Sequence, residues 1–450
     1  MGDKTNIARP RNGCALHGAL WTVEEIRGAV PIVHANAGCS FQSSLSLWAG
    51  GGGSPKFSGS AVPSTNSQER HIIFGGASRL REQIKNTVKV VDGDLYVVLT
   101  GCEAAMVGDD VDAMTKEASD QGLQVIDSQT PGIRGDVHQG YEQVMSDLVE
   151  KIPGLKGYPA PEKDEKLINV FGILPHQNFT FRGDLAEIRR ILEGAGYHVH
   201  TFFGPVDGVE ELKRAPGAAL SISFSRWGDK AAESLQRQYG IPVLKREAPP
   251  TGYAAARDLL ETVAELVPAD KERLQSFLAA EKETFSYYLG TLRDIFYEKN
   301  ISRRIAVVGD EAEVTALSHF LTDYLGACVE NAIVTDFLPA DGQSEDERRE
   351  KLSSLAENVS FTQDSHEIAR IVRHSGAGIL VASSLERAVA RAAGIELLET
   401  TFPVFDSVAL GASHTGIHGA LELSREYISA VLRADAGRKE RVVEEIVVGG

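Results

Sequence analysis

The chain has 450 residues, 42% of them hydrophobic, which is enough for about three domains with sizeable cores. Its 63 acidic and 46 basic side chains leave a net charge of −17, which disfavours non-specific attraction to nucleic acid or to anionic membranes. Residues 1–10 have no apolar segment of signal-peptide length and no run of about 18 apolar residues occurs, so we expect a cytoplasmic protein without a membrane span.

The first predicted domain covers residues 1–160. It contains two strand-like apolar runs, 29–33 and 95–99, and a glycine-rich stretch at 50–53. Residues 57–70 are mostly Ser, Asn, Gln, Pro and Gly, which indicates a surface loop. The glycines lack the Lys of a phosphate-binding loop and no GxGxxG pattern opens any domain, so we expect no nucleotide site in this chain.

The second predicted domain covers residues 161–300, after a break in composition rich in proline and charge. Apolar runs alternate here with amphipathic stretches, which predicts a βαβ order, and Gly240 is placed to end a helix. The predicted strands are 168–173, 198–203, 218–224 and 241–244, and the predicted helices are 184–193, 229–238 and most of 254–300.

The third predicted domain covers residues 301–450. It opens with an apolar strand, 304–310, that leads into a helix at 312–324, and its later strands are predicted at 332–335, 378–382 and 401–405. Three repeats of strand, turn and helix predict an α/β protein of three doubly wound, Rossmann-like domains with parallel sheets around a central cleft.

The four cysteines are too few and too scattered for a disulfide framework. Cys14, Cys39 and Cys102 each follow a glycine where an apolar segment meets a loop, whereas Cys328 leads into an apolar strand and is predicted to be a core residue. Glycine lets the backbone approach a bulky inorganic group, and thiolates are the preferred ligands of iron–sulfur clusters. The alternative, that all three are small core residues, stays open at this point.

Three thiolates do not complete a cluster that usually takes four protein ligands, so a metal site here needs another residue or another chain. His17 and His34 lie near the cysteines and are predicted to be surface or capping residues, or else hydrogen-bond donors beside the same site. His414 and His418 lack the carboxylate of a zinc-protease pattern, so we predict no metal site there.

Taken together, the three cysteine contexts resemble those of the catalytic component of nitrogenase and its relatives. The segments that carry the resemblance most specifically are Cys14 with Gly18, residues 32–34 leading to Gly38 and Cys39, the Phe-Gly-Gly of 74–76, and residues 100–102 followed by the Gly-Asp-Asp of 108–110. Weaker similarity at 170–175, 183–185, 239–242, 402–406 and 416–421 extends it over almost the whole chain.

The resemblance implies two homologous subunits of three α/β domains each, whose interface holds a P-cluster of the [8Fe-7S] type through cysteines of both chains. Carried over to this sequence, Cys14, Cys39 and Cys102 are the ligands of the cluster iron. Family members of the β type can add a serine ligand in a Thr-Pro-x-x-x-Gly-Ser segment. The similar segment 130–136 ends in Asp136 here, which can supply an oxygen ligand but not a serine.

The resemblance is to the β type. In the α type, a cysteine ahead of a Tyr-Gly-Ile-Pro segment anchors the active-site cofactor, and here that neighbourhood is Ser223, Phe224 and Ser225. The resemblance therefore implies a β-like subunit with no catalytic residue of its own, whose α-like partner carries the active-site metallocluster. It further implies an α2β2 heterotetramer and a separate ATP-dependent [4Fe-4S] reductase homodimer that supplies electrons.

Two departures from the family pattern bear on the reaction. Ala35 stands where the usual His-Gly-x-x-Gly-Cys pattern has glycine, and the chain lacks a long N-terminal extension. These features favour a nitrogenase-like reductase, such as a methylthio-alkane reductase. The alternatives are a nitrogenase β subunit that serves dinitrogen reduction, a non-catalytic scaffold for cofactor assembly, and a metal-free three-domain protein whose cysteines belong to the core.

Overall fold

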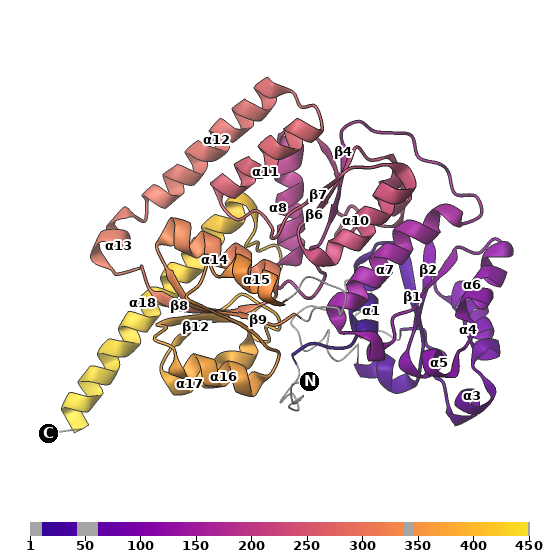
Figure 1. Ribbon diagram of the computed structural model, residues 1–450, viewed down its shortest axis with the longest axis horizontal. Helices are drawn as coiled ribbons and strands as arrows, with labels where there is room; N and C mark the ends of the chain where they lie inside the picture. The colour runs from indigo at the N-terminus through magenta and orange to yellow at the C-terminus, as the bar shows by residue number, and fades with distance from the viewer. Residues whose placement is uncertain (1–10, 43–61, 337–344, 449–450) are drawn as a thin grey trace.

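The computed structural model describes residues 11–42, 62–336 and 345–448, and in these ranges the strands form three separate parallel sheets (Figure 1). The predictions made for residues 1–10, for the glycines at 50–53 and for 57–61 lie outside the described residues. The predicted fold class is confirmed, because each sheet is parallel and is flanked by helices.

The first unit is built on a sheet of order β1-β2-β3, with strands β1 (Ala29–His34), β2 (Leu95–Thr100) and β3 (Val125–Ser128). All residues of these strands are buried, as expected for parallel strands covered on both faces. Its helices are α1 (Ala15–Glu25), α3 (Glu69–Phe74), α4 (Ala77–Val90), α5 (Cys102–Val107), α6 (Val111–Asp120) and α7 (Val137–Lys151), with the short 3₁₀ helix η1 (Gly132–Arg134).

The second and third units repeat this plan with larger sheets. The second sheet has the order β5-β4-β6-β7, with β4 (Leu167–Phe171), β5 (His198–His200), β6 (Leu220–Ser223) and β7 (Val243–Lys245). The third has the order β10-β9-β8-β11-β12, with β8 (Arg304–Gly309), β9 (Cys328–Val334), β10 (Asn358–Phe361), β11 (Ile379–Ala382) and β12 (Glu396–Glu399). The domain boundaries near residues 160 and 300 stay predictions.

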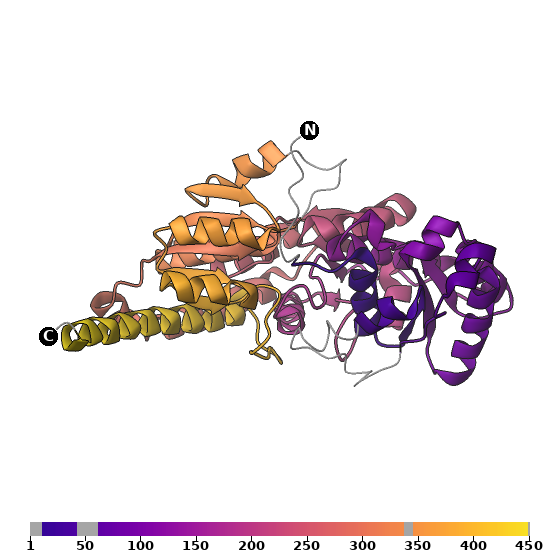
Figure 2. The same ribbon diagram turned by 90° about the horizontal axis from the view of Figure 1, so that it is seen from below.

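The helices of these two units cover the sheets and join them. The second unit carries α8 (Phe181–Gly194), α9 (Val209–Arg214), α10 (Arg226–Tyr239), α11 (Tyr253–Leu266), α12 (Lys271–Gly290) and α13 (Arg293–Glu298). The third carries α14 (Glu311–Leu325), α15 (Glu345–Leu352), α16 (Ser365–His374), α17 (Arg387–Ala393) and α18 (Gly416–Val448). The helix α18 packs against α8, α11 and α12 of the second unit and then projects past the third (Figures 1 and 2).

Several predicted elements differ from the observed ones. Residues 401–405 do not form a strand, because Pro403 has no N–H for a ladder and the edge strand is β12. The strand predicted at 198–203 ends at His200, since the carboxylate of Asp207 accepts hydrogen bonds from the backbone of the next two residues. Cys328 is exposed rather than buried, because it is the first residue of β9 and pairs with Arg304, the exposed first residue of β8.

The three units share one apolar core. A single cluster of buried side chains runs from α1 through the second sheet to α18. In the described part of the chain, no helix has the length and apolar character needed to cross a lipid bilayer.

Arg11 links the start of the first unit to the third. Its guanidinium pairs with Glu386 and donates to Ser383 Oγ at 2.8 Å and to the carbonyl oxygen of Phe402 at 3.1 Å. The side chains of Arg11 and Glu386 are both 2% exposed. The segment just before Cys14 is therefore fixed by a buried ion pair.

We predict that Arg11→Ala lowers the free energy of unfolding by about 3 kcal/mol, since it leaves the Glu386 carboxylate buried without its cation. Arg425→Ala, which breaks an exposed pair with Glu422, should cost less than about 1 kcal/mol. Urea denaturation of both variants measures the difference. Equal losses for the two would contradict the role of the buried pair.

Candidate functional site

Cys14 lies directly before α1, where the chain meets the segment that leads into α7. It forms an isolated antiparallel bridge with Asp136, closed by backbone hydrogen bonds of 3.0 and 3.1 Å. The helices α1 and α7 approach closely because Gly18 and Gly140 face the opposite helix. A Cβ on Gly18 would lie 1.9 Å from the carbonyl oxygen of Val137, so this contact requires glycine.

Cys39 lies in the first turn of the helix that begins at residue 37, just after β1. Asn36 caps this helix start, since its Oδ1 accepts a hydrogen bond of 3.1 Å from the backbone N–H of Cys39. The side-chain amide nitrogen of Asn36 donates to Oε1 of Glu103. Asn36 therefore joins the Cys39 turn to the segment that carries Cys102.

Cys102 is the first residue of α5, directly after β2. Because β1 and β2 are parallel neighbours, the turns with Cys39 and Cys102 leave the same edge of the sheet. Gly101 N donates to the carbonyl oxygen of His34 at 3.0 Å, and a Cβ on Gly101 would lie 2.5 Å from that of Ala35. Glycine at position 101 thus lets the two turns touch.

The structure brings the three predicted cysteines together. Gly132 in η1 faces two of them, because a Cβ there would lie 2.9 Å from Cys14 Sγ and 3.5 Å from Cys102 Sγ. Burial raises the pKa of Cys39 to about 11, with added contributions from the charge of Glu103 and from the thiols of Cys14 and Cys102. All three thiols are partly buried and form no disulfide.

Each of these thiols lies at the N-terminal start of a helix. Cys14 precedes α1, Cys102 opens α5, and Cys39 belongs to the first turn after β1. Helix starts present unpaired backbone N–H groups that can donate to sulfur, although at Cys39 burial and the charge of Glu103 outweigh this effect and raise the pKa. Within the described residues no group of three His, Cys, Asp or Glu side chains is arranged to hold a single metal ion.

Asp136, the predicted oxygen ligand, serves as the N-cap of α7. Its Oδ1 accepts from the backbone N–H of His138 at 3.0 Å and from His138 Nδ1 at 3.2 Å. Its Oδ2 accepts from Gln363 Nε2 at 3.1 Å and from Asn12 Nδ2 at 3.5 Å. Both carboxylate oxygens are therefore engaged by this chain.

His138 and Asp136 form a buried ion pair beside the thiols. Burial alone lowers the pKa of His138, but the negative charges of Asp136, Asp336 and Asp310 raise it to about 9. Burial would raise the pKa of Asp136, but the charge and hydrogen bonds of His138, with the amide of Gln363, hold it below its ordinary value. The pair is charged at neutral pH.

His34, the last residue of β1, precedes the Cys39 turn and contacts two other segments through its ring. Its ring is completely buried, so the prediction of a surface or capping residue is wrong. Its Nε2 contacts Asp109 Oδ2 at 3.0 Å and its Nδ1 contacts Thr65 Oγ1 at 3.1 Å. Asp109 also accepts from Gly76 N at 2.7 Å, so this network joins the Gly-Gly and Gly-Asp-Asp segments to β1.

The remaining predicted residues lie elsewhere or play other parts. His17 stacks on Trp21, with ring centroids 6.2 Å apart. His414 contacts Glu426 at 2.9 Å, and His418 is exposed. Cys328 donates to Glu357 Oε1 at 3.4 Å on the third unit and has no part in the thiol site.

Large apolar side chains are exposed around the thiols. Phe74 is 85% exposed and Met106 is 75% exposed, and their helices α3 and α5 pack against each other. The full set, which we call the apolar rim, is Phe41, Ile72, Ile73, Phe74, Met106, Val107 and Ile133. Exposed large apolar side chains gathered near one site are typical of a protein interface.

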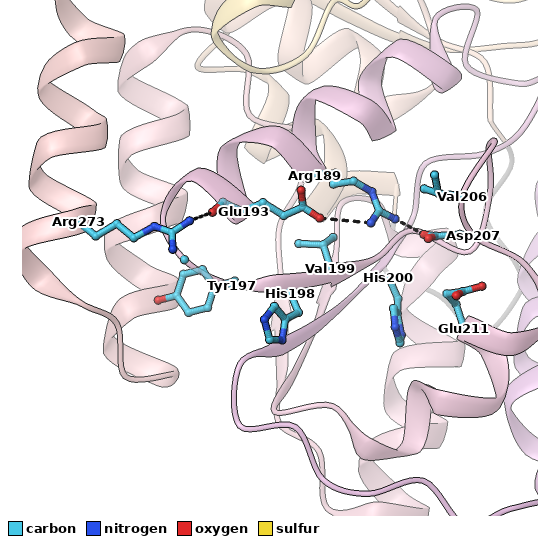
Figure 3. A pocket seen from close by; sticks show the side chains of 11 residues that line it. Arg189, Glu193, Tyr197, His198, Val199, His200, Val206, Asp207, Glu211 and Arg273 are labelled. Atoms are coloured by element: carbon cyan, nitrogen blue, oxygen red, sulfur yellow. Dashed lines mark hydrogen bonds and ion pairs between the residues drawn. The ribbon is translucent and has the colours of Figure 1, made fainter.

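A separate cavity of about 510 Å³ lies along the edge strand β5 (Figure 3). Its two arginines are engaged: Arg189 pairs with Glu193 and Asp207, and Arg273 donates to the backbone carbonyl oxygen of Glu193. Burial lowers the pKa of His200 in its wall to about 4, so this ring is neutral at pH 7. None of the cysteines lines this cavity.

Sequence reasoning missed Asn36, Glu103, His138 and Gln363 as parts of the thiol site. Asn36 carried a signal, since an Asn three residues before Cys39 matches a helix N-cap. Glu103 stands directly after Cys102. Gln363 comes from the third unit, and only tertiary structure brings it to Asp136.

The sequence pattern of the family described as nitrogenase component 1 type oxidoreductase matches residues 14–432. The chain is 24% identical to the nitrogenase molybdenum-iron protein beta chain of Methanothermobacter thermautotrophicus, over 95% of each chain. It is 23% identical to the beta chain of Clostridium pasteurianum, over 94% of this chain and 93% of that one.

The match to an alpha chain is less extensive. The nitrogenase molybdenum-iron protein alpha chain of Methanosarcina barkeri is 26% identical, but over 61% of this chain and 51% of that one. Among solved structures, the one titled "Nitrogenase Cp1 at pH 6.5" has a TM-score of 0.79 at 20% identity and covers 96% of this chain and 95% of its own. That likeness shows the fold.

Proposed function

Because this chain belongs to the nitrogenase component 1 type oxidoreductases, and is β-like within them, we propose that it holds half of a shared iron–sulfur cluster and relays electrons to an α-like partner. The observation that carries the proposal is the convergence of Cys14, Cys39 and Cys102 at three helix starts. A bound iron–sulfur cluster would supply electron storage and transfer there.

The donor set fits such a cluster. Soft thiolates are suited to iron–sulfur centres, and the helix starts offer backbone N–H groups to sulfur. Gly132 packs directly against the Cys14 side chain, where a Cβ would lie 2.7 Å from Cys14 Cβ and 2.9 Å from its Sγ, so any larger residue would displace this thiol. We assign the iron ligands to Cys14, Cys39 and Cys102, and the cluster to the [8Fe-7S] P-cluster type, with the partner supplying the remaining ligands.

The segment 223–225 corresponds to the region that anchors the active-site cofactor in α-type chains, and here its hydroxyls bond to the backbone. Ser223 Oγ donates to the carbonyl oxygen of Ser225 at 2.7 Å, and Ser225 Oγ donates to that of Gly172 at 2.8 Å. All three residues of this segment, including Phe224, are buried. These hydroxyls close a backbone turn, which supports placing the active-site metallocluster in the partner.

The apolar rim supports a protein partner on this face. An α-like subunit that covers the rim would bury Phe41, Phe74 and Met106 and bring its own thiols next to those of this chain. We propose that two such pairs form an α2β2 heterotetramer. Electrons would come from a separate ATP-dependent [4Fe-4S] reductase homodimer, as this sequence has no phosphate-binding loop of its own.

The reaction that we propose for the complex is reduction of the C–S bond of methylthio-alkanes, with dinitrogen reduction as the second candidate. Two residues of the thiol site support the first: Ala35 replaces the usual glycine and packs on Gly101, and Asp136 stands in place of the β-type serine and is held as a helix cap.

The complex, supplied with its reductase and ATP, should release a thiol and an alkane from a methylthio-alkane and form little ammonia from dinitrogen. Gas chromatography of the headspace and an ammonia assay measure both products. Ammonia as the main product would favour the dinitrogen reaction, and turnover of neither substrate with iron still bound would favour a cofactor-assembly scaffold.

We predict that Cys102→Ala lowers the iron content of the complex to less than half, because one thiolate of this chain is lost. Cys328→Ala is the matched control, since Cys328 is exposed on the third unit and should keep its full iron. Iron is counted per complex after purification without oxygen. Equal iron in the two variants would contradict the ligand assignment.

Met106→Glu should reduce co-purification of the partner by about tenfold or more, because it would bury an unpaired charge in the interface. Val90→Glu is the control: Val90 is 83% exposed and ends α4, about 20 Å along that helix from its start beside Asp109. The ratio of partner to tagged chain is measured by densitometry. Similar losses in both variants would contradict this interface.

A further inference from the structure

Glu103 lies between two of the three thiol-bearing helix starts. It directly follows Cys102 in α5, and its Oε1 accepts a hydrogen bond from the side-chain amide of Asn36. The same Asn36 accepts from the backbone N–H of Cys39 at 3.1 Å. One amide therefore fixes the carboxylate of Glu103 relative to both Cys39 and Cys102.

The second carboxylate oxygen has no such contact. Oε2 of Glu103 is buried and makes no hydrogen bond to any described residue. A buried carboxylate oxygen without a donor is costly unless a cation binds it. The charge of Glu103 also acts on the thiol of Cys39, so the carboxylate is close to the thiol site.

In contrast to Glu103, Asp136 has no unpaired carboxylate oxygen. Its Oδ1 is occupied by two donors from His138, and its Oδ2 by the amides of Gln363 and Asn12. To bind iron, Asp136 would have to give up the cap of α7 and its ion pair. Glu103 would give up nothing, because Oε1 keeps its bond to Asn36 while Oε2 is available.

We propose that Oε2 of Glu103 is an oxygen ligand of one iron atom in the cluster, in addition to the three thiolates of this chain. The inference rests on the proposed function, since it requires the iron–sulfur cluster to be present. Asn36 then acts as a positioning residue that orients the carboxylate through Oε1. An iron atom bound in this way would carry an oxygen donor in addition to sulfur.

The test compares Glu103→Gln with Asp136→Asn in the complex purified without oxygen. Gln keeps an oxygen for the bond to Asn36 but replaces the anionic oxygen with an amide, which is a poor ligand. Iron K-edge absorption fine structure and ⁵⁷Fe Mössbauer spectra report the ligands directly. We expect the iron–oxygen component to disappear in Glu103→Gln and to persist in Asp136→Asn, because both oxygens of Asp136 are already engaged by helix α7 and Gln363.

Glu103→Ala, measured with and without added formate, covers the case in which the Gln variant fails to assemble. Formate should restore the iron–oxygen component if the vacated position is a ligand site. Unchanged spectra in Glu103→Gln, loss of the component in Asp136→Asn instead, or no response to formate would each overturn the inference. A wild-type complex without iron would instead overturn the proposed function.

Discussion

The close approach of three helix starts at the carboxyl edge of the first sheet is the constraint on which the site depends. It requires that side chains be absent at the contact points: Gly18 where α1 meets α7, Gly101 where two turns touch, and Gly132 beside two sulfurs. A Cβ would collide with the backbone of Val137 at position 18, with the Cβ of Ala35 at position 101 and with the Cys14 side chain at position 132. The glycines thus let the segments that carry the thiols approach one another, and each thiol lies at the start of a helix.

The first unit does not hold this site alone. The third unit contributes Gln363 to Asp136 and pairs Glu386 with Arg11, while the second contributes His176 and Arg182 to Glu25 at the end of α1. The sheet of the first unit has only three strands among the described residues, so it offers little packing area to keep the site rigid by itself. These buried ion pairs and hydrogen bonds connect the thiol site to the rest of the molecule, so a partner on the apolar rim would meet a fixed surface.

The structural features that we predicted correctly from the sequence are those that depend on local residue patterns. Continuous apolar runs such as residues 95–99 identified parallel strands, and glycine beside cysteine identified the three thiols that the fold brings together. Features that depend on tertiary packing were missed or wrong: His34 is buried, with its ring between Thr65 and Asp109, and Cys328 is exposed at the first residue of β9. The free oxygen of Glu103 becomes evident only once Asn36 is seen to hold the other one.

The central claim is that this chain and a homologous partner share an iron–sulfur cluster. The most direct measurement counts iron, molybdenum and vanadium in the complex purified without oxygen through a tag on this chain, and identifies the chains that come with it. We expect several iron atoms per chain together with a homologous α-like subunit. A protein with neither iron nor a homologous partner would contradict it and would leave Cys14, Cys39 and Cys102 as structural residues.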